Sequence, residues 1–536
     1  MSSAALAAPA TAARRLVSPW IVAAAVVIPT FMEVLDTTIA NVALRYIAGG
    51  LSAPVSDGEW VITSYLAANA IILPISGWLG TRLGRRNYFL MSIAMFTLAS
   101  ALCGIATSLG ELIAFRILQG LAGGGLQPIS QGILLDAFPK EKQGTAMTLF
   151  ATAALIAPVI GPTLGGYITD NIGWRWIFII NVPVGLLALG MCYAVVSDPD
   201  YLKVQQRELR GRHNFDAIGL SLLVIAMVSW EIWLSKGQEW DWFGDPFHRI
   251  HWLFTFFAGS LVTLIWWELR NPSPLIDFRT LKDQNFRASC LIIFCAFGVL
   301  YANTTTLPGL LQSLFGYDAT TSGLVLSPAG IFSVMVLFIV GGLMGRGIDA
   351  RYFIGIGLVV VGLGNSWMAG MNLDLSPWHV IWPRVVVICG LSMIFAPLNV
   401  AAFQNISTAQ RGAAVGLLAL LRNEGGSVGT SLAKAFFERR DQFHTLRLNE
   451  NLDPFNPALT DLLKQGKEFF LQQTGDPRLS ELMTVNVFQQ VRAQQAASLA
   501  YFDIFWALGV LALFLAPLIF LMRPSVAEKG AHIAAE

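Results

Sequence analysis

The sequence predicts an all-α membrane protein with fourteen transmembrane helices. Of its 536 residues, 55% are hydrophobic and only 13% are charged. Soluble domains carry about 25% charged residues, so most of this surface is not expected to face water. Fourteen predominantly apolar segments of about 20 residues recur along the chain, and each is long enough to cross a bilayer. The net charge of +1 argues against a nucleic-acid partner.

The apolar segments follow one another with polar connections between them. The first segment is too long for a cleaved signal peptide, so we expect the protein to retain it. The expected spans are residues 20–44, 59–80, 88–108, 111–135, 144–168, 177–197, 216–235, 250–268, 288–309, 320–344, 352–372, 378–402, 412–436 and 500–522.

Basic residues assign the two sides of the membrane. Short loops on one side contain most of the Arg and Lys residues, and the opposite short loops contain few. Because cytoplasmic loops are enriched in these residues, we expect residues 1–19 and 523–536 to be cytoplasmic tails of an inner-membrane protein. The polar residues 437–499, with amphipathic helices near 457–472 and 479–499, are then expected to form a periplasmic segment.

Two pairs of positions indicate an internal repeat. GWLGTRLGRR (77–86) and GLMGRGIDAR (342–351) lie 265 residues apart, and Arg116 and Arg384 lie 268 residues apart. A parallel duplication places the substrate path between its halves. The predicted organisation is an N-terminal six-helix half (20–200), a linker with an inserted helix pair (201–270) and a C-terminal six-helix half (271–522).

Helix 1 carries two carboxylates. Asp36 lies deep in an apolar span, where a charge costs about 3 kcal/mol, so it is expected to face a cavity and to have a function. Glu33 lies one turn earlier on the same face. Two close carboxylates in a low dielectric do not both ionise readily, which favours proton binding and release as the halves of the protein move. The alternative is that both acids are static hydrogen-bond partners of other helices.

Further charged residues lie in predicted spans. Arg116 of helix 4 lies at a depth similar to that of Asp36, so an ion pair or a shared cavity is expected, either static or weakened when Asp36 gains a proton. Arg422 and Glu424 of helix 13 are candidates for the substrate path, or for a structural pair on the cytoplasmic side.

Two motifs are rich in glycine. APVIGPTLGG (157–166) predicts a kinked, closely packed helix 5. GWLGTRLGRR predicts a tight cytoplasmic turn that takes part in gating, or that only supplies basic charge. The residues concerned are Pro158, Gly161, Pro162, Gly165 and Gly166 in helix 5, and Gly77, Gly80, Arg82, Gly84, Arg85 and Arg86 in the turn.

Several chemistries have no motif in the sequence. There is no GxxxxGK[ST] for ATP, no histidine or cysteine pattern for a metal, and no nucleophile–base arrangement for an enzyme. The energy is therefore expected to come from an ion gradient without any cofactor. Protons are favoured because the buried groups are titratable carboxylates.

These motifs together resemble the fourteen-helix drug:proton antiporters of the major facilitator superfamily, and among them the EmrB-like multidrug efflux pumps. LDTTIANVAL (35–44) is similar to the helix 1 motif of that group, RILQG (116–120) to the helix 4 motif and APVIGPTLGG to the antiporter motif of helix 5. The resemblance implies a major facilitator fold and adds Asn41 and Gln119 to the expected site.

The resemblance also implies partners. It implies alternating access, with hydrophobic substrates and protons competing for one cavity, and transfer to a periplasmic adaptor protein and an outer-membrane channel. Residues 437–499 would contact the adaptor or would cap the outer vestibule. The sequence departs from the group at Thr81, Arg45, Glu33 and Glu424, and the two additional acids could shift the substrate range toward cations or change the proton stoichiometry.

Two other functions remain open at this stage. One is a dedicated transporter of a single metabolite, such as a siderophore or an organic acid. The other is a membrane sensor or scaffold that binds without transport. Both glycine-rich motifs argue against the second function, because both suit a bundle that moves.

Overall fold

The computed structural model describes residues 18–139, 142–199, 202, 216–272, 274–373, 376–407, 410–450, 452 and 455–525. Most of both predicted tails, and residues 203–215 of the linker, lie outside the described part. Within that part the secondary structure is helical and contains no strand, which confirms the prediction of an all-α protein.

The helices occur in the order that the apolar segments predict. They are α1 (Pro19–Gly50), α2 (Val55–Gly58), α3 (Trp60–Leu83), α4 (Arg85–Ile105), α5 (Leu109–Gly123), α6 (Leu126–Ala137), α7 (Gln143–Asn171), α8 (Trp176–Ile179), α9 (Asn181–Val195), α11 (Ala217–Lys236), α12 (Arg249–Arg270), α13 (Gln284–Leu314), α14 (Ala319–Leu326), α15 (Pro328–Gly345), α16 (Ala350–Ala369), α17 (Pro377–Phe403), α18 (Arg411–Asn449), α19 (Pro457–Thr474) and α20 (Pro477–Leu515). Short 3₁₀ turns cover Trp242–Gly244, Phe278–Lys282 and Ala516–Leu521.

Twelve helical segments of the described residues are long and apolar enough to cross a membrane. Two of the fourteen predicted spans are missing from this set, so the count of fourteen is not confirmed. The predicted span 111–135 is divided into α5 and α6 at Gly124 and Gly125. The predicted span 412–436 lies in α18, where Arg422 and Glu424 reduce the apolar character of the helix.

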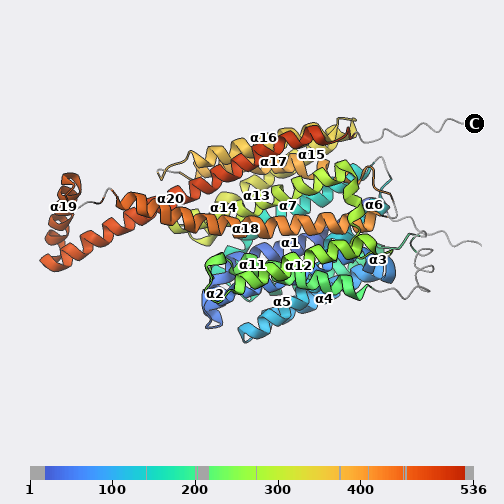
Figure 1. Ribbon diagram of the computed structural model, residues 1–536, viewed down its shortest axis with the longest axis horizontal. Helices are drawn as coiled ribbons and strands as arrows, with labels where there is room; N and C mark the ends of the chain where they lie inside the picture. Colours follow the sequence, from blue (N-terminus) through green and yellow to red (C-terminus); the bar gives the residue numbers. More distant parts are fainter. Residues whose placement is uncertain are drawn as a thin grey trace, which may run out of the picture.

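The helices run side by side in one bundle (Figure 1). In the N-terminal part, α1 packs against α7 and α9, and α3 packs against α5. In the C-terminal part, α13 packs against α18, and α16 packs against α17 and α20. The two parts meet where α18 contacts α3, and where α14 and α15 contact α7. Within the predicted inserted pair, α11 packs against α3 and α18, and α12 packs mainly against α11.

The segment before the last span differs from its prediction. We expected a separate polar segment over residues 437–499, but α18 continues to Asn449, and α20 begins at Pro477 and runs without a break into the last apolar span. The amphipathic helix expected near 457–472 is present as α19. Figure 1 shows α19 and the first part of α20 projecting from the bundle, at the end away from the C-terminus.

Candidate functional site

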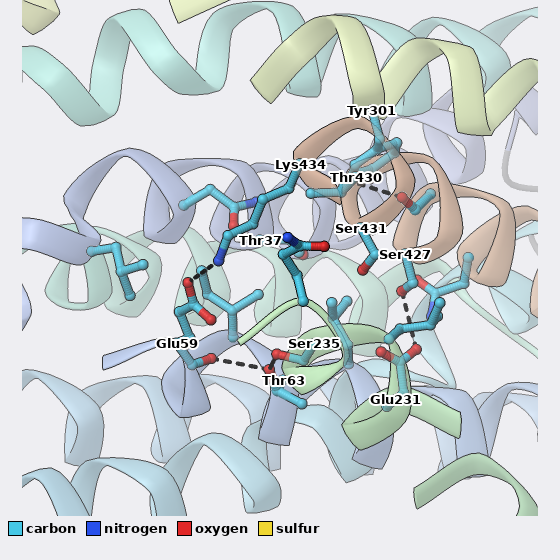
Figure 2. A pocket seen from close by; sticks show the side chains of 18 residues that line it. Thr37, Glu59, Thr63, Glu231, Ser235, Tyr301, Ser427, Thr430, Ser431 and Lys434 are labelled. Atoms are coloured by element: carbon cyan, nitrogen blue, oxygen red, sulfur yellow. Dashed lines mark hydrogen bonds and ion pairs between the residues drawn. The ribbon is translucent and has the colours of Figure 1, made fainter. Parts of the chain in front are cut away.

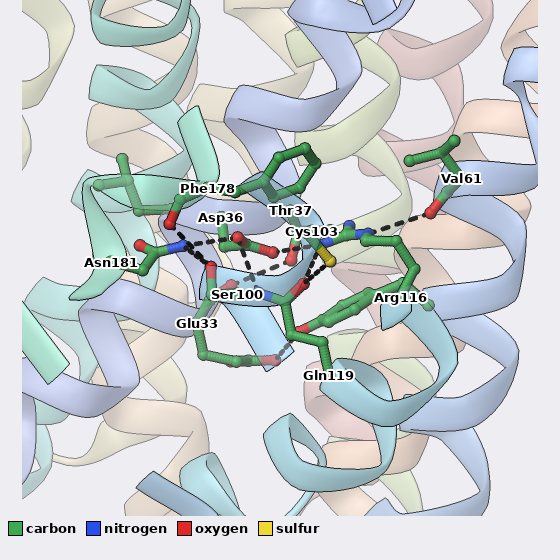
Figure 3. A network of polar contacts seen from close by, with 12 residues as sticks. Glu33, Asp36, Thr37, Val61, Ser100, Cys103, Arg116, Gln119, Phe178 and Asn181 are labelled. Atoms are coloured by element: carbon green, nitrogen blue, oxygen red, sulfur yellow. Dashed lines mark hydrogen bonds and ion pairs between the residues drawn. The ribbon is translucent and has the colours of Figure 1, made fainter. Parts of the chain in front are cut away.

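Asp36 lies at the middle of α1 and is only 2% exposed. Its Oδ2 accepts a hydrogen bond from Nη1 of Arg116 at 2.6 Å. Its Oδ1 accepts hydrogen bonds from Nε2 of Gln119 at 3.0 Å and from Nδ2 of Asn181 at 2.7 Å (Figure 3). Both oxygens of this buried carboxylate therefore have hydrogen-bond partners. The predicted neighbourhood of Asp36, Arg116 and Gln119 is therefore present, with Asn181 of α9 as an additional partner.

Arg116 is completely buried in α5. Its Nε donates to the carbonyl oxygen of Val61 at 3.1 Å, and its Nη1 also donates to Oε1 of Gln119 at 2.8 Å. The guanidinium lies 4.2 Å from the centre of the Tyr65 ring. A buried ion pair is tolerated when hydrogen bonds satisfy both ions, and loss of one partner leaves a costly uncompensated charge.

Glu33 has different partners although it lies on the same helix. It is 4% exposed and accepts hydrogen bonds from the Tyr65 hydroxyl at 3.3 Å, from Nδ2 of Asn69 at 3.2 Å and from Nε2 of Gln127. Oε1 of Gln127 in turn accepts a hydrogen bond from Nη2 of Arg422. One glutamine therefore links a carboxylate of α1 to an arginine of α18, across the contact between the N- and C-terminal helices.

Arg422 and Glu424 do not form a pair with each other. The Arg422 guanidinium lies among the rings of Phe150, Phe297 and Phe395, at 5.6–5.9 Å. Glu424 interacts instead with Glu231 of α11, and Glu231 accepts a hydrogen bond from the hydroxyl of Ser427 at 3.0 Å. Side chains two positions apart in a helix point in different directions, which separates the two charges.

A cavity of about 210 Å³ opens between α1, α3, α11, α13 and α18. Asn41 lines it, as the resemblance implied, together with Thr37 from the same face of α1. Asp36 and Glu33 are not among the lining residues. In this conformation both acids are enclosed, and neither meets the cavity.

The glycine-rich turn after α3 is mostly helical. Gly77 and Gly80 lie within α3, and only Gly84, with φ of 91°, forms the turn to α4. A Cβ on Gly77 would lie 2.6 Å from the carbonyl oxygen of Gly412, so the glycine allows α3 to approach the start of α18.

The arginines of the turn form contacts with neighbouring segments of the chain. Arg85 forms an ion pair with Asp136, in the last turn of α6. Arg86 donates to the carbonyl oxygens of Val196 and Tyr193. Arg82 stacks on the Trp78 ring at 5.2 Å.

The motif of helix 5 lies in α7 and packs against α1 beside Asp36. A Cβ on Gly161 would lie 2.1 Å from Oγ1 of Thr38, and a Cβ on Gly165 would lie 3.0 Å from Ile39. Gly166 is buried nearby. Pro158 and Pro162 are inside the helix, where proline removes backbone hydrogen bonds and permits bending.

Sequence reasoning missed several residues of these networks. Glu231 carried the same signal as Asp36, a single acid inside an apolar span, and the same argument would have found it. Gln127, Asn69, Tyr65 and Asn181 are uncharged, and no local pattern distinguishes them from other polar residues in a bundle.

A family model described as the Major Facilitator Superfamily matches residues 26–430. The chain belongs to this superfamily. It is 36% identical over 487 residues to the Multidrug export protein EmrB of Haemophilus influenzae, with 90% of the chain and 92% of that protein covered. It is 34% identical over 503 residues to the Fatty acid resistance protein FarB of Neisseria gonorrhoeae, with 93% and 95% covered.

The fold has counterparts among solved structures. The proton:xylose symporter XylE superposes with a TM-score of 0.62 at 12% identity, covering 95% of this chain and 97% of XylE. At this identity the likeness shows the fold alone. The predictions of a major facilitator fold and of an EmrB-like sequence are thus confirmed.

Proposed function

We propose that the protein exports hydrophobic drugs or toxic compounds across a bacterial inner membrane by proton antiport. The observation that carries the proposal is the buried ion pair of Asp36 and Arg116, which joins α1 to α5 deep inside the bundle. The names of the relatives, a multidrug export protein and a fatty acid resistance protein, support export of such compounds.

A proton on Asp36 would remove the charge that Arg116, Gln119 and Asn181 now surround. The contacts of α1 with α5 and α9 would weaken, and the balance between outward-open and inward-open states would shift. Glu33 is the second coupling residue in this proposal, because it reaches Arg422 through Gln127. A proton on Glu33 would weaken that link between the two parts of the bundle.

We further propose fourteen membrane crossings. The break at Gly124 and Gly125 leaves α5 and α6 together long enough for one crossing, and the charges of α18 face protein rather than lipid because Arg422 and Glu424 are buried. An even number of crossings and the bias of basic loops then place both termini in the cytoplasm.

The outer parts of α18 and α20, with α19, would face the periplasm. Large apolar side chains are exposed on α19, on α20 and just before α19, including Phe469 at 57%, Leu482 at 59% and Phe455 at 90%. Exposed apolar groups outside the bilayer support a contact with another protein. We propose that this segment binds the periplasmic adaptor of a tripartite efflux system that also includes an outer-membrane channel.

The test of proton coupling is export from proteoliposomes under an imposed pH gradient. Asp36→Asn is expected to abolish gradient-driven flux, whereas Asp461→Asn, an exposed change in α19, is expected to transport like the unmodified protein. Normal gradient-driven transport by the Asp36→Asn variant would remove Asp36 from the mechanism.

A panel of substrates separates the remaining functions. Export of structurally unrelated compounds supports multidrug efflux, and export of one chemical class alone would support a dedicated transporter. The name of FarB makes fatty acids the first class to try. Binding of the panel compounds without any flux would instead support a sensor or scaffold.

A further inference from the structure

A second pair of buried acids lies away from Asp36, where the inserted helix α11 meets α18. Glu231 of α11 is 2% exposed and Glu424 of α18 is 6% exposed. The two carboxylates interact electrostatically. Ser427, one turn along α18 from Glu424, donates a hydrogen bond to Oε1 of Glu231 at 3.0 Å. The pair therefore bridges the two helices.

The two carboxylates have few hydrogen-bond donors and no ion-pair partner among the described residues. Both carboxylate oxygens of Glu424 are buried without a hydrogen bond, and the indole of Trp230 lies near Glu424 without normal hydrogen-bond geometry. The ion pairs found among the described residues include neither Glu231 nor Glu424. A buried carboxylate without a counter-charge is strongly unfavourable, so such a pair favours the uptake of a positive charge, either a proton or a bound cation.

The nearby cations are engaged with other groups. Lys236 of α11 forms an ion pair with Glu239 at 2.6 Å. Lys434 of α18 forms one with Glu59 at 2.6 Å. Nη2 of Arg422 donates to Gln127. Two acids thus lie close together, and the nearby basic side chains form contacts with other groups.

Glu231 lines the cavity of about 210 Å³, whereas Glu424, which interacts with it, is not among the lining residues. Glu231, Ser427 and Lys434 line it, and Figure 2 shows the Glu231–Ser427 contact and the Lys434–Glu59 pair on different sides of the space. Along α18, the distance from Ser427 to Lys434 is about 10 Å. Glu424 lies one turn beyond Ser427, on the same side of the helix.

The other walls of the cavity are suited to an apolar ligand. Leu66 of α3, Leu234 of α11 and the ring of Tyr301 of α13 line it. Aromatic faces attract cations. Nδ2 of Asn423, a further lining residue, is buried without a hydrogen bond and is available to a ligand. The volume fits a small ligand, or the charged end of a larger one that extends along the helices.

We propose that this cavity binds lipophilic organic cations, with the positive charge against Glu231 and Glu424 and the apolar groups against Leu66, Leu234 and Tyr301. The inserted helix α11 would thereby form part of a substrate site. The proposal rests on the proposed function to the extent that the bound cation is one of the exported compounds.

The experiment measures binding of tetraphenylphosphonium to the purified full-length protein by equilibrium dialysis. Triphenylphosphine oxide, a neutral compound of similar shape, is the comparison ligand. We expect Glu231→Gln and Glu424→Gln each to weaken tetraphenylphosphonium binding by at least about tenfold, because each removes one carboxylate charge. Binding of triphenylphosphine oxide is expected to change little. Glu468→Gln, which alters an exposed acid of α19 outside the cavity, is the matched control and is expected to bind like the unmodified protein.

Three outcomes would overturn the proposal. They are no binding of tetraphenylphosphonium, unchanged binding in both glutamine variants, and equal loss of both ligands. Unchanged binding with altered proton stoichiometry would identify the acids as proton sites only. Flux of uncharged compounds tests the proposed function separately. Such flux without tetraphenylphosphonium binding overturns the cation site alone, and binding without flux of any compound overturns the proposed function.

Discussion

Arg116 and Arg384 occupy matching positions of the predicted repeat, but their surroundings differ. Both are buried, with 0% and 1% exposure. Arg116 faces the carboxylate of Asp36 at 2.6 Å. The same offset of 268 residues relates Asp36 to Thr304, and Nη2 of Arg384 donates to the hydroxyl of Thr304 at 3.4 Å. The N-terminal part has an ion pair at the position where the C-terminal part has a neutral contact.

Under the proposed mechanism, this difference would confine proton chemistry to one part of the bundle. A hydroxyl does not titrate near neutral pH, whereas a carboxylate can be tuned to do so. Arg384 retains two nitrogen atoms, Nε and Nη1, without a hydrogen bond. At the matching positions of the predicted repeat, both parts thus have a buried arginine, but the partner of the arginine differs.

The largest expected effect is that of Arg116→Gln. This change leaves the Asp36 charge buried without its counter-ion, and we expect a loss of about 3–5 kcal/mol in the free energy of unfolding. Denaturant or thermal unfolding in detergent measures it. The double variant Asp36→Asn with Arg116→Gln is expected to recover much of the loss. Equal stability of Arg116→Gln and the unmodified protein would show that the pair contributes nothing.

The next largest effect on stability is expected where a glycine allows two helices to pack closely. Gly161 of α7 meets α1, and Gly429 of α18 meets Gly298 of α13 in the same close manner. Gly161→Ala is expected to cost about 1–3 kcal/mol through overpacking against Thr38 and to slow export. Gly259→Ala in α12 is the control, because its Cβ meets nothing within 4 Å. A destabilised Gly259→Ala variant would indicate a helix effect unrelated to packing.

A smaller effect on stability is expected at the two turns of the predicted repeat, which differ in how they cap the following helix. Gly84 begins α4 without a side-chain cap, whereas Asp349 caps α16 and accepts hydrogen bonds from Arg351 and Ser525. Burial raises the pKa of the Asp349 carboxyl, but the hydrogen bonds from these two residues outweigh burial and hold the pKa below its ordinary value.

Asp349→Ala, which removes the cap, is therefore expected to lose about 1 kcal/mol in the free energy of unfolding at neutral pH. The contribution of a carboxyl with a lowered pKa is complete above its unfolded pKa of about 3.9, and it disappears as the pH falls through the lowered folded value. Unfolding curves of both proteins between pH 7 and strong acid measure this. If the difference in the free energy of unfolding between the two proteins grew as the pH fell, the prediction would be contradicted.

The smallest change in stability is expected for Arg384→Met. It removes a buried charge that has no carboxylate partner among the hydrogen bonds of the described residues, so we expect a change within about 1 kcal/mol in either direction. The same unfolding measurement compares it with Arg116→Gln. A loss as large as that of Arg116→Gln would remove the contrast between the two arginines.

The helical class, the order of the spans and the proximity of Asp36 and Arg116, as an ion pair or around a shared cavity, could be predicted from the sequence alone. Apolar runs must be helical in a membrane because each backbone group needs an internal hydrogen bond. A deep acid and a deep arginine attract each other because no water is present to solvate them.

The contact partner of each remaining charged side chain could not be predicted from the sequence and is known only from the tertiary structure. Glu33 and Asp36 share a face of α1, yet one reaches α18 through Gln127 and the other remains among α5 and α9. Glu424 turns toward α11 rather than toward Arg422. Such choices depend on the rotation and depth at which neighbouring helices pack, and contacts between residues distant in the chain set these two quantities.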